Sequence, residues 1–459
     1  MTQEQNLLTG SVPKKLAAFA LPLFLANLLQ SFYNVVDMLV VGKIVGETGL
    51  AAISNASMLC FIINSLCIGL TMGGAVLVAQ YNGANDVRGQ EDTIGILFLL
   101  SFAASVVVTM IGLAIYAPLF RALGVPSDAY RDACAYMEII CWGTAFVFGY
   151  NAACSILKGL GDSRTPLYFV GLATAVNVAL DLLLVGPFGL GTAGAAYATI
   201  TAQGISFVTS MVYLRRHKWT FSPRDVRFQM DKLIAILKVG LPTAVQMVVV
   251  NTAYLLVTGM LNQFGLSVAA ASGVGLKINT FAGMPCWAIG QAVTVMVGQC
   301  MGVGQFQRAR KVVKIGLLLN FAVTLTVVVV VQLLAEQLIL LFDSTSPEVI
   351  QEGVLYLRIC CGVNSLAYAA MYTLDSFAIG VGSANVAMFN ALLEAVIVRL
   401  PVSWLLAFSL AMGVPGVYLG QALSPILPTL VGSVYFMSKG WEGKTLVQRR
   451  PEEEGGTDE

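Results

Sequence analysis

Four polar residues lie within the first long apolar segment of the chain, which covers 16–41: Asn27, Gln30, Asn34 and Asp37. Their spacing of three, four and three residues places them on one stripe of a helix. A carboxylate inside a bilayer costs at least about 2.5–3.5 kcal/mol and usually marks an ion path or a substrate site. The stripe is therefore expected to face protein or water, with lipid on the opposite side. The alternative is a buried carboxylate that only holds helices together.

A second set of oxygen-bearing side chains falls in the apolar segments 164–187 and 192–214. Asp181 lies one helical turn after Asn177 on the same face, and Thr199 follows in the next segment. Asp181 precedes the end of its segment by roughly six residues, or about 9 Å at 1.5 Å per residue. Asp37 and Thr199 are expected at a similar depth, so three helices bring these side chains to one level.

Two carboxylates, an amide and a hydroxyl at one depth could perform two kinds of chemistry. Oxygen ligands suit a hard cation such as Na⁺. Two neighbouring carboxylates in a low dielectric could also hold a proton near neutral pH. The spacing does not choose between the two ions, and a structural polar network without ion exchange is the alternative. The predicted cation-coupling site, with Na⁺ or H⁺ as its ion, consists of Asp37, Asn177, Asp181 and Thr199.

The composition requires a membrane protein. The 459 residues are 57% hydrophobic and 11% charged, which is far from the balance of a soluble domain. The net charge of +1 gives no indication of nucleic acid, and nine cysteines without metal spacing plus one histidine argue against a zinc or haem site. Apolar runs long enough to cross the bilayer predict an all-α protein of about twelve transmembrane helices. They lie near 16–41, 50–80, 93–117, 130–156, 164–187, 192–214, 233–261, 268–301, 312–342, 349–379, 385–410 and 414–438.

Basic residues set the predicted orientation. They gather before the first segment and in the loops that follow even-numbered segments, whereas the other loops hold only Lys43, Arg121 and Arg131. By the positive-inside rule, both termini are cytoplasmic. The richest loop, 215–232, is a basic linker between an N-lobe at 1–214 and a C-lobe at 233–438, and 439–459 forms an acidic cytoplasmic tail.

The chain repeats itself with an offset near 220 residues. AFALPLFLANLL near residue 18 corresponds to LKVGLPTAVQMV near 237, which aligns Pro22 with Pro242. LKGLGDS at 157–163 corresponds to AIGVGSA at 378–384, and Gln80 aligns with Gln299. Six helices per half predict two parallel repeats with a substrate path between them. This arrangement indicates a two-lobed transporter. Pro22 and Pro242 lie within the first turns of their helices, where a proline either permits a bend or forms a static kink.

The second half lacks the first half's carboxylates, because Val257 aligns with Asp37 and Val402 with Asp181. Its own ionisable residues in apolar segments either neutralise one another or contribute to a substrate cavity. Aromatic residues lining such a cavity would suit an amphipathic or cationic organic compound. The cavity candidates from both halves are Gln30, Tyr33, Asn34, Tyr150, Lys277, Asp375 and Glu394.

These features resemble the multidrug and toxic compound extrusion (MATE) family over residues 14–440. The resemblance rests on ALPLFLANLLQSFYNVVDMLVVGKIVG, on the Gln80-containing end of the second segment, on LKGLGDSRTP and on NVALDLLLV. The last motif, with Asp37, is similar to the DinF-like prokaryotic branch. That resemblance implies a cation-coupling network at Asp37, Asn177, Asp181 and Thr199, and a bend of the first helix at Pro22.

The resemblance further implies a monomeric, multi-pass transporter of the bacterial cytoplasmic (inner) membrane. It would export small organic compounds, often cationic, by antiport with Na⁺ or H⁺ through alternating access, without a cofactor and without enzymatic activity. A flippase of lipids or lipid-linked oligosaccharides is the alternative, although it favours more basic residues along the cavity. A membrane enzyme would need a cluster of His, Cys or paired carboxylates near one membrane face.

Overall fold

The computed structural model describes residues 7–122, 124–217, 228–342, 346–362 and 364–447. These residues form helices joined by short turns, with no strand among them. Helices suit long apolar runs because a spanning segment in lipid must satisfy its backbone hydrogen bonds internally. The first six are α1 (Val12–Ile44), α2 (Glu47–Gly83), α3 (Val87–Ala122), α4 (Ser127–Gly159), α5 (Arg164–Leu184) and α6 (Gly191–His217).

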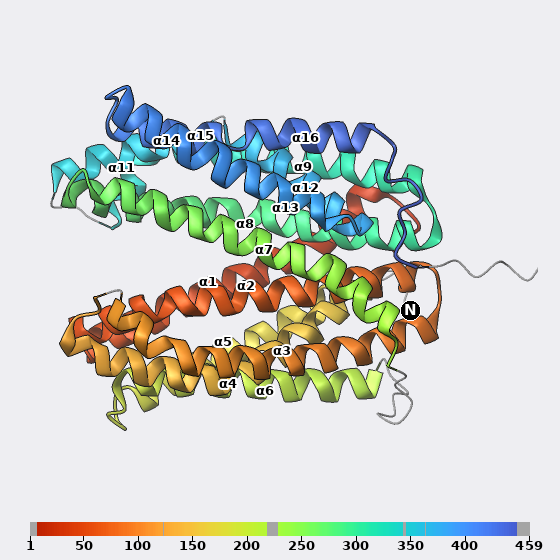
Figure 1. Ribbon diagram of the computed structural model, residues 1–459, viewed down its shortest axis with the longest axis horizontal. Helices are drawn as coiled ribbons and strands as arrows, with labels where there is room; N and C mark the ends of the chain where they lie inside the picture. The colour runs from red at the N-terminus through yellow and green to blue at the C-terminus, as the bar shows by residue number, and fades with distance from the viewer. Residues whose placement is uncertain (1–6, 123, 218–227, 343–345, 363, 448–459) are drawn as a thin grey trace, which may run out of the picture.

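The second half is more divided. It contains α7 (Met230–Asn262), α8 (Leu266–Val303), α9 (Phe306–Leu333), α10 (Ala335–Leu340), α11 (Pro347–Cys360), α12 (Ser365–Val381), α13 (Ala384–Leu392), the π-helix η2 (Leu393–Arg399), α14 (Leu400–Trp404), the π-helix η3 (Leu405–Ser409), α15 (Val414–Leu423) and α16 (Ile426–Met437). Helices α1–α6 gather in one group, here the N-lobe, and α7–α16 in a second, here the C-lobe (Figure 1).

The predicted segments correspond to these helices with differences of a few residues at most ends. Within the described residues, ten helical segments are long and apolar enough to span a membrane, and the bent pair α11 and α12 makes an eleventh. The segment predicted at 192–214 is α6, a helix of 27 residues with several hydroxyl and amide side chains. Large apolar side chains such as Phe102, Met110 and Leu318 are exposed on outer faces, as expected of a surface that meets lipid.

The division between the lobes is not clean at α1. Leu16, Phe19 and Leu23 are buried in a core cluster with residues of α8 and α12, so the first half of α1 packs into the C-lobe. Arg308 of α9 donates to the backbone carbonyl of Leu7 at 2.8 Å. The second half of α1 packs on α5. The first helix therefore connects both lobes, and the predicted N-lobe boundary does not describe its packing.

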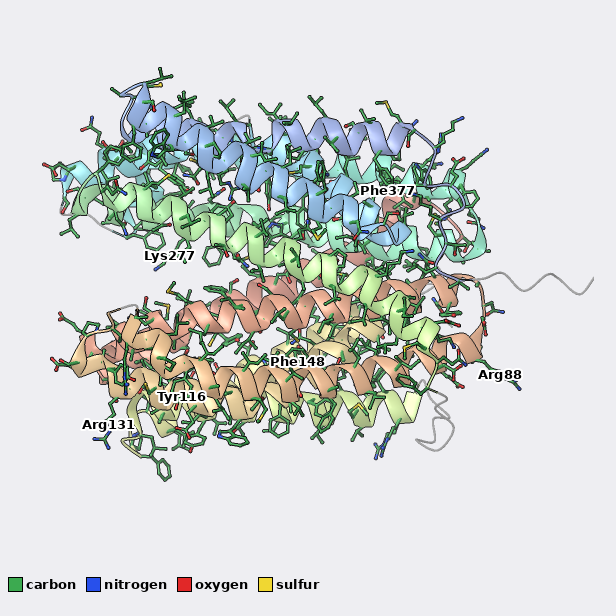
Figure 2. All side chains as sticks on the ribbon, in the orientation of Figure 1. Arg88, Tyr116, Arg131, Phe148, Lys277 and Phe377 are labelled. Carbon is green, nitrogen blue, oxygen red and sulfur yellow. The ribbon has the colours of Figure 1, made fainter. Side chains whose placement is uncertain are left out.

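Two glutamines join the lobes at the end that carries Arg88, opposite the end that carries Arg131 (Figure 2). Gln80 of α2 donates to the carbonyl of Gly380 in the C-lobe at 3.2 Å. Its repeat-related counterpart, Gln299 of α8, donates to the carbonyl of Gly159 in the N-lobe at 3.0 Å. Each repeat thus donates a glutamine hydrogen bond to a glycine carbonyl of the other repeat. Close approach requires glycine, because a Cβ on Gly83 would overlap the Gln299 carbonyl oxygen.

Residues 439–447, which belong to the predicted acidic cytoplasmic tail at 439–459, pack against the protein. Trp441 is fully buried against Phe377 and Phe436. The Leu446 amide donates to Gln80 Oε1 at 2.8 Å, and Thr445 Oγ1 donates to the same oxygen at 3.3 Å. We refer to 439–447 as the C-terminal strap. The acidic stretch of the predicted tail and most of the predicted linker lie outside the described residues.

Candidate functional site

Three N-lobe helices converge on the residues predicted to couple a cation. Asp37 of α1 and Asp181 of α5 are buried, as is Asn177 one turn earlier on α5. Asn177 Nδ2 donates to Oγ1 of the half-buried Thr199 of α6 at 3.4 Å. The helices that carry the two carboxylates, α1 and α5, pack against each other. We name these four residues the N-lobe polar site.

The start of α5 explains how the sequence places this site. Gly161 adopts a positive φ of 87° in the turn after α4, a conformation that glycine accepts without strain. Asp162 Oδ1 then accepts hydrogen bonds from the backbone amides of Arg164 and Thr165, at 3.1 and 3.0 Å. This cap satisfies amides that a helix start leaves without partners. The LKGLGDSRTP motif therefore fixes the beginning of α5, and with it the direction in which Asn177 and Asp181 point.

The N-lobe polar site is rich in acceptors and poor in donors. Both carboxylate oxygens of Asp181, Asp37 Oδ1 and Asn177 Oδ1 are buried without a hydrogen-bond partner. Neither carboxylate forms an ion pair with any residue that the structure describes. An isolated buried carboxylate is strongly unfavourable, and removing a charge from water requires a compensating partner. Asp37 and Asp181 therefore form an acceptor-rich site without a counter-charge among the described residues.

A small cavity lies beside Asn177 and Thr199, and neither Asp37 nor Asp181 is among its lining residues. Its volume is about 10 Å³, enough for one water-sized particle, and its walls include Tyr33, Asn177, Thr199 and Gln203. Gln203 Oε1 is a further buried acceptor without a partner. Its polar walls are hydroxyl and carboxamide side chains, which both donate and accept hydrogen bonds, so the cavity suits a small polar particle better than an apolar group. Within the described residues, no group of three or more His, Cys, Asp or Glu side chains could hold a transition metal.

The predicted cavity candidates are dispersed. Gln30 and Asn34 are exposed on α1, while Tyr150 is buried in the N-lobe core. Lys277 is exposed on α8, where it points toward the N-lobe (Figure 2). Asp375 and Glu394 are buried in the C-lobe. Tyr33 is the one candidate that borders the small N-lobe cavity.

The large cavity of the molecule lies mainly in the C-lobe and has a volume of about 620 Å³. Drug-sized ligands occupy cavities of about 300–1,000 Å³. Its walls come from α2, α7, α8, α9, α12 and the segments around η2 and α15. Aromatic and polar wall residues that the sequence analysis did not select are Tyr254, Trp287, Tyr368, Arg399 and Gln421.

A π-helix explains one charged wall of this cavity. Arg399 Nη2 donates to Glu394 Oε1 in a buried ion pair, and the two residues are five positions apart. In an α-helix that spacing separates side chains by roughly 140°, whereas the i→i+5 pattern of η2 brings them together. Pro401 follows closely and has no amide to donate to the preceding turn. The sequence signal was thus a Glu–Arg pair five apart before a proline.

The remaining C-lobe carboxylate is also partnered. Asp375 Oδ1 accepts from Asn390 Nδ2 at 2.6 Å, and Oδ2 accepts from Gln246 Nε2 at 3.5 Å. Lys277 forms no ion pair with Asp375 or Glu394 among the described residues. Val257 and Val402 occupy the positions aligned with Asp37 and Asp181. The C-lobe therefore does not repeat the acceptor-rich site.

Two lobes of membrane-spanning helices, a buried ionisable site in one and a drug-sized cavity in the other, define a helical membrane transporter. The family model MatE matches residues 22–183 and 242–405, and the chain belongs to this family of multidrug and toxic compound extrusion proteins. The two matches begin at Pro22 and Pro242, 220 residues apart, which agrees with the predicted internal repeat.

Relatives and solved structures agree with this family. The chain is similar to the "Probable multidrug resistance protein YoeA" of Bacillus subtilis (strain 168), with 31% identity over 72% of this chain and 74% of the relative. It is 29% identical to YpnP of the same organism, over 96% of this chain and 98% of the relative. The fold matches the outward-facing conformation of a multidrug resistance MATE family transporter with a TM-score of 0.91, at 22% identity and covering 97% and 99% of the two chains.

Proposed function

We propose that this MATE protein is a secondary active efflux transporter, which exports organic compounds, many of them cationic, in exchange for Na⁺ or H⁺. The observation that carries the proposal is the set of buried carboxylate oxygens of Asp37 and Asp181 that have no partner in the chain. The family and its multidrug resistance relatives support the export of small organic molecules. Coupling then takes place in the N-lobe, at Asp37, Asn177, Asp181 and Thr199.

A bound cation supplies what the N-lobe polar site lacks. Na⁺ would be coordinated by the oxygens of Asp37, Asn177 and Asp181, because hard cations prefer carboxylate and carbonyl oxygen ligands. A proton would instead convert one carboxylate into a donor for the other. In either case the ion neutralises an uncompensated carboxylate in the interior. Its binding therefore favours the conformation in which the four residues of the N-lobe polar site lie together. Such differential affinity is what an ion needs in order to drive a conformational change.

The first helix is the element that transmits this change. Pro22 lies inside α1 and is buried, and it deprives the preceding turn of a hydrogen bond. The half of α1 before Gln30 packs into the C-lobe, while the half that bears Asp37 packs on α5. A bend at Pro22 would therefore move the coupling site relative to the C-lobe cavity. Opening toward the end that carries Arg88 additionally requires the Gln80 and Gln299 bonds to break.

The proposal includes a setting for the protein. Both termini face the cytoplasm of a bacterial cell, and the protein spans the inner membrane as a monomer without a cofactor or an enzymatic activity. The basic residues near Arg88 and the strap end support this orientation under the positive-inside rule. The DinF-like assignment of the coupling site rests on NVALDLLLV and Asp37.

The test is gradient-driven export from proteoliposomes, with Na⁺ and H⁺ gradients imposed separately. Ethidium and 2-naphthoate serve as a cationic and an anionic substrate. Wild type is expected to move at least one of them with one of the two ions, whereas Asp37→Asn and Asp181→Asn are expected not to. Asp128→Asn, an exposed carboxylate of the same lobe, is the control. Full transport in both variants would show that the carboxylates are structural.

A flippase is the second candidate, since most of the residues that line the large cavity are apolar. It predicts that no ion gradient moves either soluble substrate, while a fluorescent lipid analogue crosses the bilayer. In the same proteoliposomes, dithionite quenching of the labelled lipid measures its movement between the leaflets and so tests the flippase function.

A further inference from the structure

The first part of the C-terminal strap, residues 439–447, is anchored on the C-lobe. Trp441 is fully buried in a core cluster with residues of α8, α9 and α12. Its Nε1 donates to the backbone carbonyl of Phe436 in α16 at 3.0 Å. The guanidinium of Arg310 in α9 lies 5.5 Å from the centre of the indole ring and forms an ion pair with Glu442 at 2.8 Å. An aromatic anchor, a hydrogen bond and a charge pair thus fix this part to the C-lobe.

The other end of the strap packs on the N-lobe. Val447 is 2% exposed and belongs to a core cluster whose other members lie mostly on α2, α3 and α4. Leu446 packs against the same cluster. It also lies on the turn after α12, because a Cβ on Gly382 would be 2.8 Å from Leu446 Cγ. Leu446 therefore lies at the seam between the lobes, and Val447 lies beyond it in the N-lobe.

Hydrogen bonds at Gln80 join this end of the strap to both lobes. Gln80 Oε1 accepts from the Leu446 amide at 2.8 Å and from Thr445 Oγ1 at 3.3 Å. Gln80 Nε2 donates to the C-lobe carbonyls of Gly380 and Val381, at 3.2 and 3.3 Å. Gln80 is fully buried, and a buried acceptor that loses its donors is unfavourable. The strap therefore stabilises the arrangement in which Gln80 bridges the two lobes.

The two ends of the strap differ in how strongly they are held. The end at Trp441 buries an indole, the side chain with the largest apolar surface, and adds the ion pair with Arg310. The end at 445–447 is held by two aliphatic side chains and by the bonds to Gln80. Because the ends attach to different lobes, separation of the lobes at this end of the molecule requires one of them to detach. The weaker 445–447 end is the one that detaches.

We propose that the C-terminal strap is a latch, which holds the lobes together at the end of the molecule that carries Arg88. When the lobes separate there, the 445–447 end leaves the N-lobe and Trp441 keeps the strap on the C-lobe, so the same segment docks again on closure. This inference rests on the proposed export function, because alternating access is what requires this end to open. It adds a segment outside the spanning helices to the parts that move.

The test is double electron–electron resonance on the full-length protein in nanodiscs, without substrate or ion gradient. Ketone-reactive spin labels are attached to p-acetylphenylalanine in place of Arg88 and Gln307, which are exposed at the starts of α3 and α9. This chemistry leaves the nine native cysteines unlabelled. Wild type is expected to show mainly one short distance between the lobes. A wild type that shows mainly a longer distance contradicts a latch that holds this end closed.

The decisive variant is Val447→Asn, which removes the apolar contact with the N-lobe and leaves Trp441 in place. The population with the longer distance is expected to rise about threefold or more, since burial of a valine side chain stabilises the docked end. Lys444→Asn, which introduces the same residue at an exposed position of the strap, is the matched control and is expected to resemble wild type. An equal shift in both variants overturns the proposal.

A second variant makes the test independent of changes in the core. Thr445→Val keeps the shape of the side chain but removes the hydroxyl that donates to Gln80, so a smaller shift in the same direction is expected. Thr445→Ser restores the hydroxyl and is expected to restore the wild-type distances. If Val447→Asn and Thr445→Val lower the melting temperature but leave the distances unchanged, the strap is a static cover and the latch is overturned.

The latch and the proposed export function fail separately. The distances are measured without a gradient, so they do not depend on ion coupling. If wild type exports nothing from proteoliposomes while Val447→Asn shows the expected shift, the transport function alone is contradicted. If wild type exports and the distances in Val447→Asn stay unchanged, the latch alone is contradicted.

Discussion

The two lobes descend from one repeated sequence, yet their buried polar groups differ in what they lack. The N-lobe polar site leaves oxygens of Asp37 and Asp181 without partners. In the C-lobe, valines occupy both aligned positions, and the buried carboxylates of Asp375 and Glu394 each accept hydrogen bonds from neighbouring side chains. Glu394 Oε2 and two nitrogens of Arg399 lack hydrogen-bond partners, but the two residues form an ion pair and offset each other's charge. After duplication, one lobe therefore holds two buried carboxylates without a counter-charge among the described residues, whereas the other pairs its buried glutamate with an arginine.

The largest expected effect comes from giving the N-lobe the residues of the C-lobe. Asp37→Val/Asp181→Val removes both unpartnered carboxylates, so gradient-driven export should fall to the level of protein-free liposomes. The same change should raise thermal stability, since a carboxylate at membrane depth costs about 2.5–3.5 kcal/mol. Export is measured in proteoliposomes and stability by thermal unfolding in detergent. A variant that exports like wild type, or that melts earlier, contradicts the proposed role of the site.

The next effect compares the buried Arg399–Glu394 ion pair of the C-lobe with the unpaired carboxylates of the N-lobe. Arg399→Gln leaves Glu394 buried without a counter-charge, which should destabilise the protein by about 3–5 kcal/mol. Glu394→Gln/Arg399→Gln should regain most of that loss, whereas Asp181→Asn should cost little. Thermal unfolding of the three variants measures the difference. Equal melting temperatures for the single and double C-lobe variants would mean that the pair is not electrostatically coupled.

A smaller effect concerns the two repeat-related glutamines. Gln80→Leu and Gln299→Leu each remove an inter-lobe hydrogen bond, with a net contribution of about 0.5–1.5 kcal/mol. The effect should be larger at Gln80, which also accepts from Leu446 and Thr445 of the strap. Hydrogen–deuterium exchange at the ends of α2 and α8 measures the opening. A larger increase for Gln299→Leu would reverse the expected order.

The smallest effect concerns the ring that flanks Arg399. Tyr254→Leu removes a cation–π contact of about 0.5–2 kcal/mol, so the melting temperature should fall slightly. Tyr254→Phe keeps the ring and should melt like wild type. Thermal unfolding in detergent measures both variants. If the leucine variant melts at the wild-type temperature, the ring does not stabilise the guanidinium.

Much of the fold follows from the sequence because apolar runs and an offset of 220 residues are properties of the chain itself. The proximity of Asn177, Thr199 and the two aspartates could be predicted for the same reason: depth along a straight helix is a simple count of residues. Their role in coupling an ion stays a prediction.

The C-lobe cavity could not be predicted in this way. Its walls come from helices far apart in the sequence, and residues such as Tyr254 and Trp287 have no pattern that distinguishes them from lipid-facing aromatics. Arg399 lies in the predicted segment 385–410, but a helix of 3.6 residues per turn points it away from Glu394. The π-helix before Pro401 changes that direction, and no periodicity signals it. The packing of the C-terminal strap was not predicted because 439–447 is rich in polar residues and glycine. Its contact with the protein depends on the buried Trp441.

The strap also sets an order of events during synthesis. Leu446 follows Gln80 by 366 residues, so at 5–20 residues per second the ribosome makes it about 20–70 s later. Even when the last helix of the C-lobe has been made, Gln80 Oε1 lacks the amide that it accepts from in the finished protein. The junction between the lobes is therefore completed by nearly the last described residue to be made. A nascent chain stalled before 440 would have every helix and an unfinished closure.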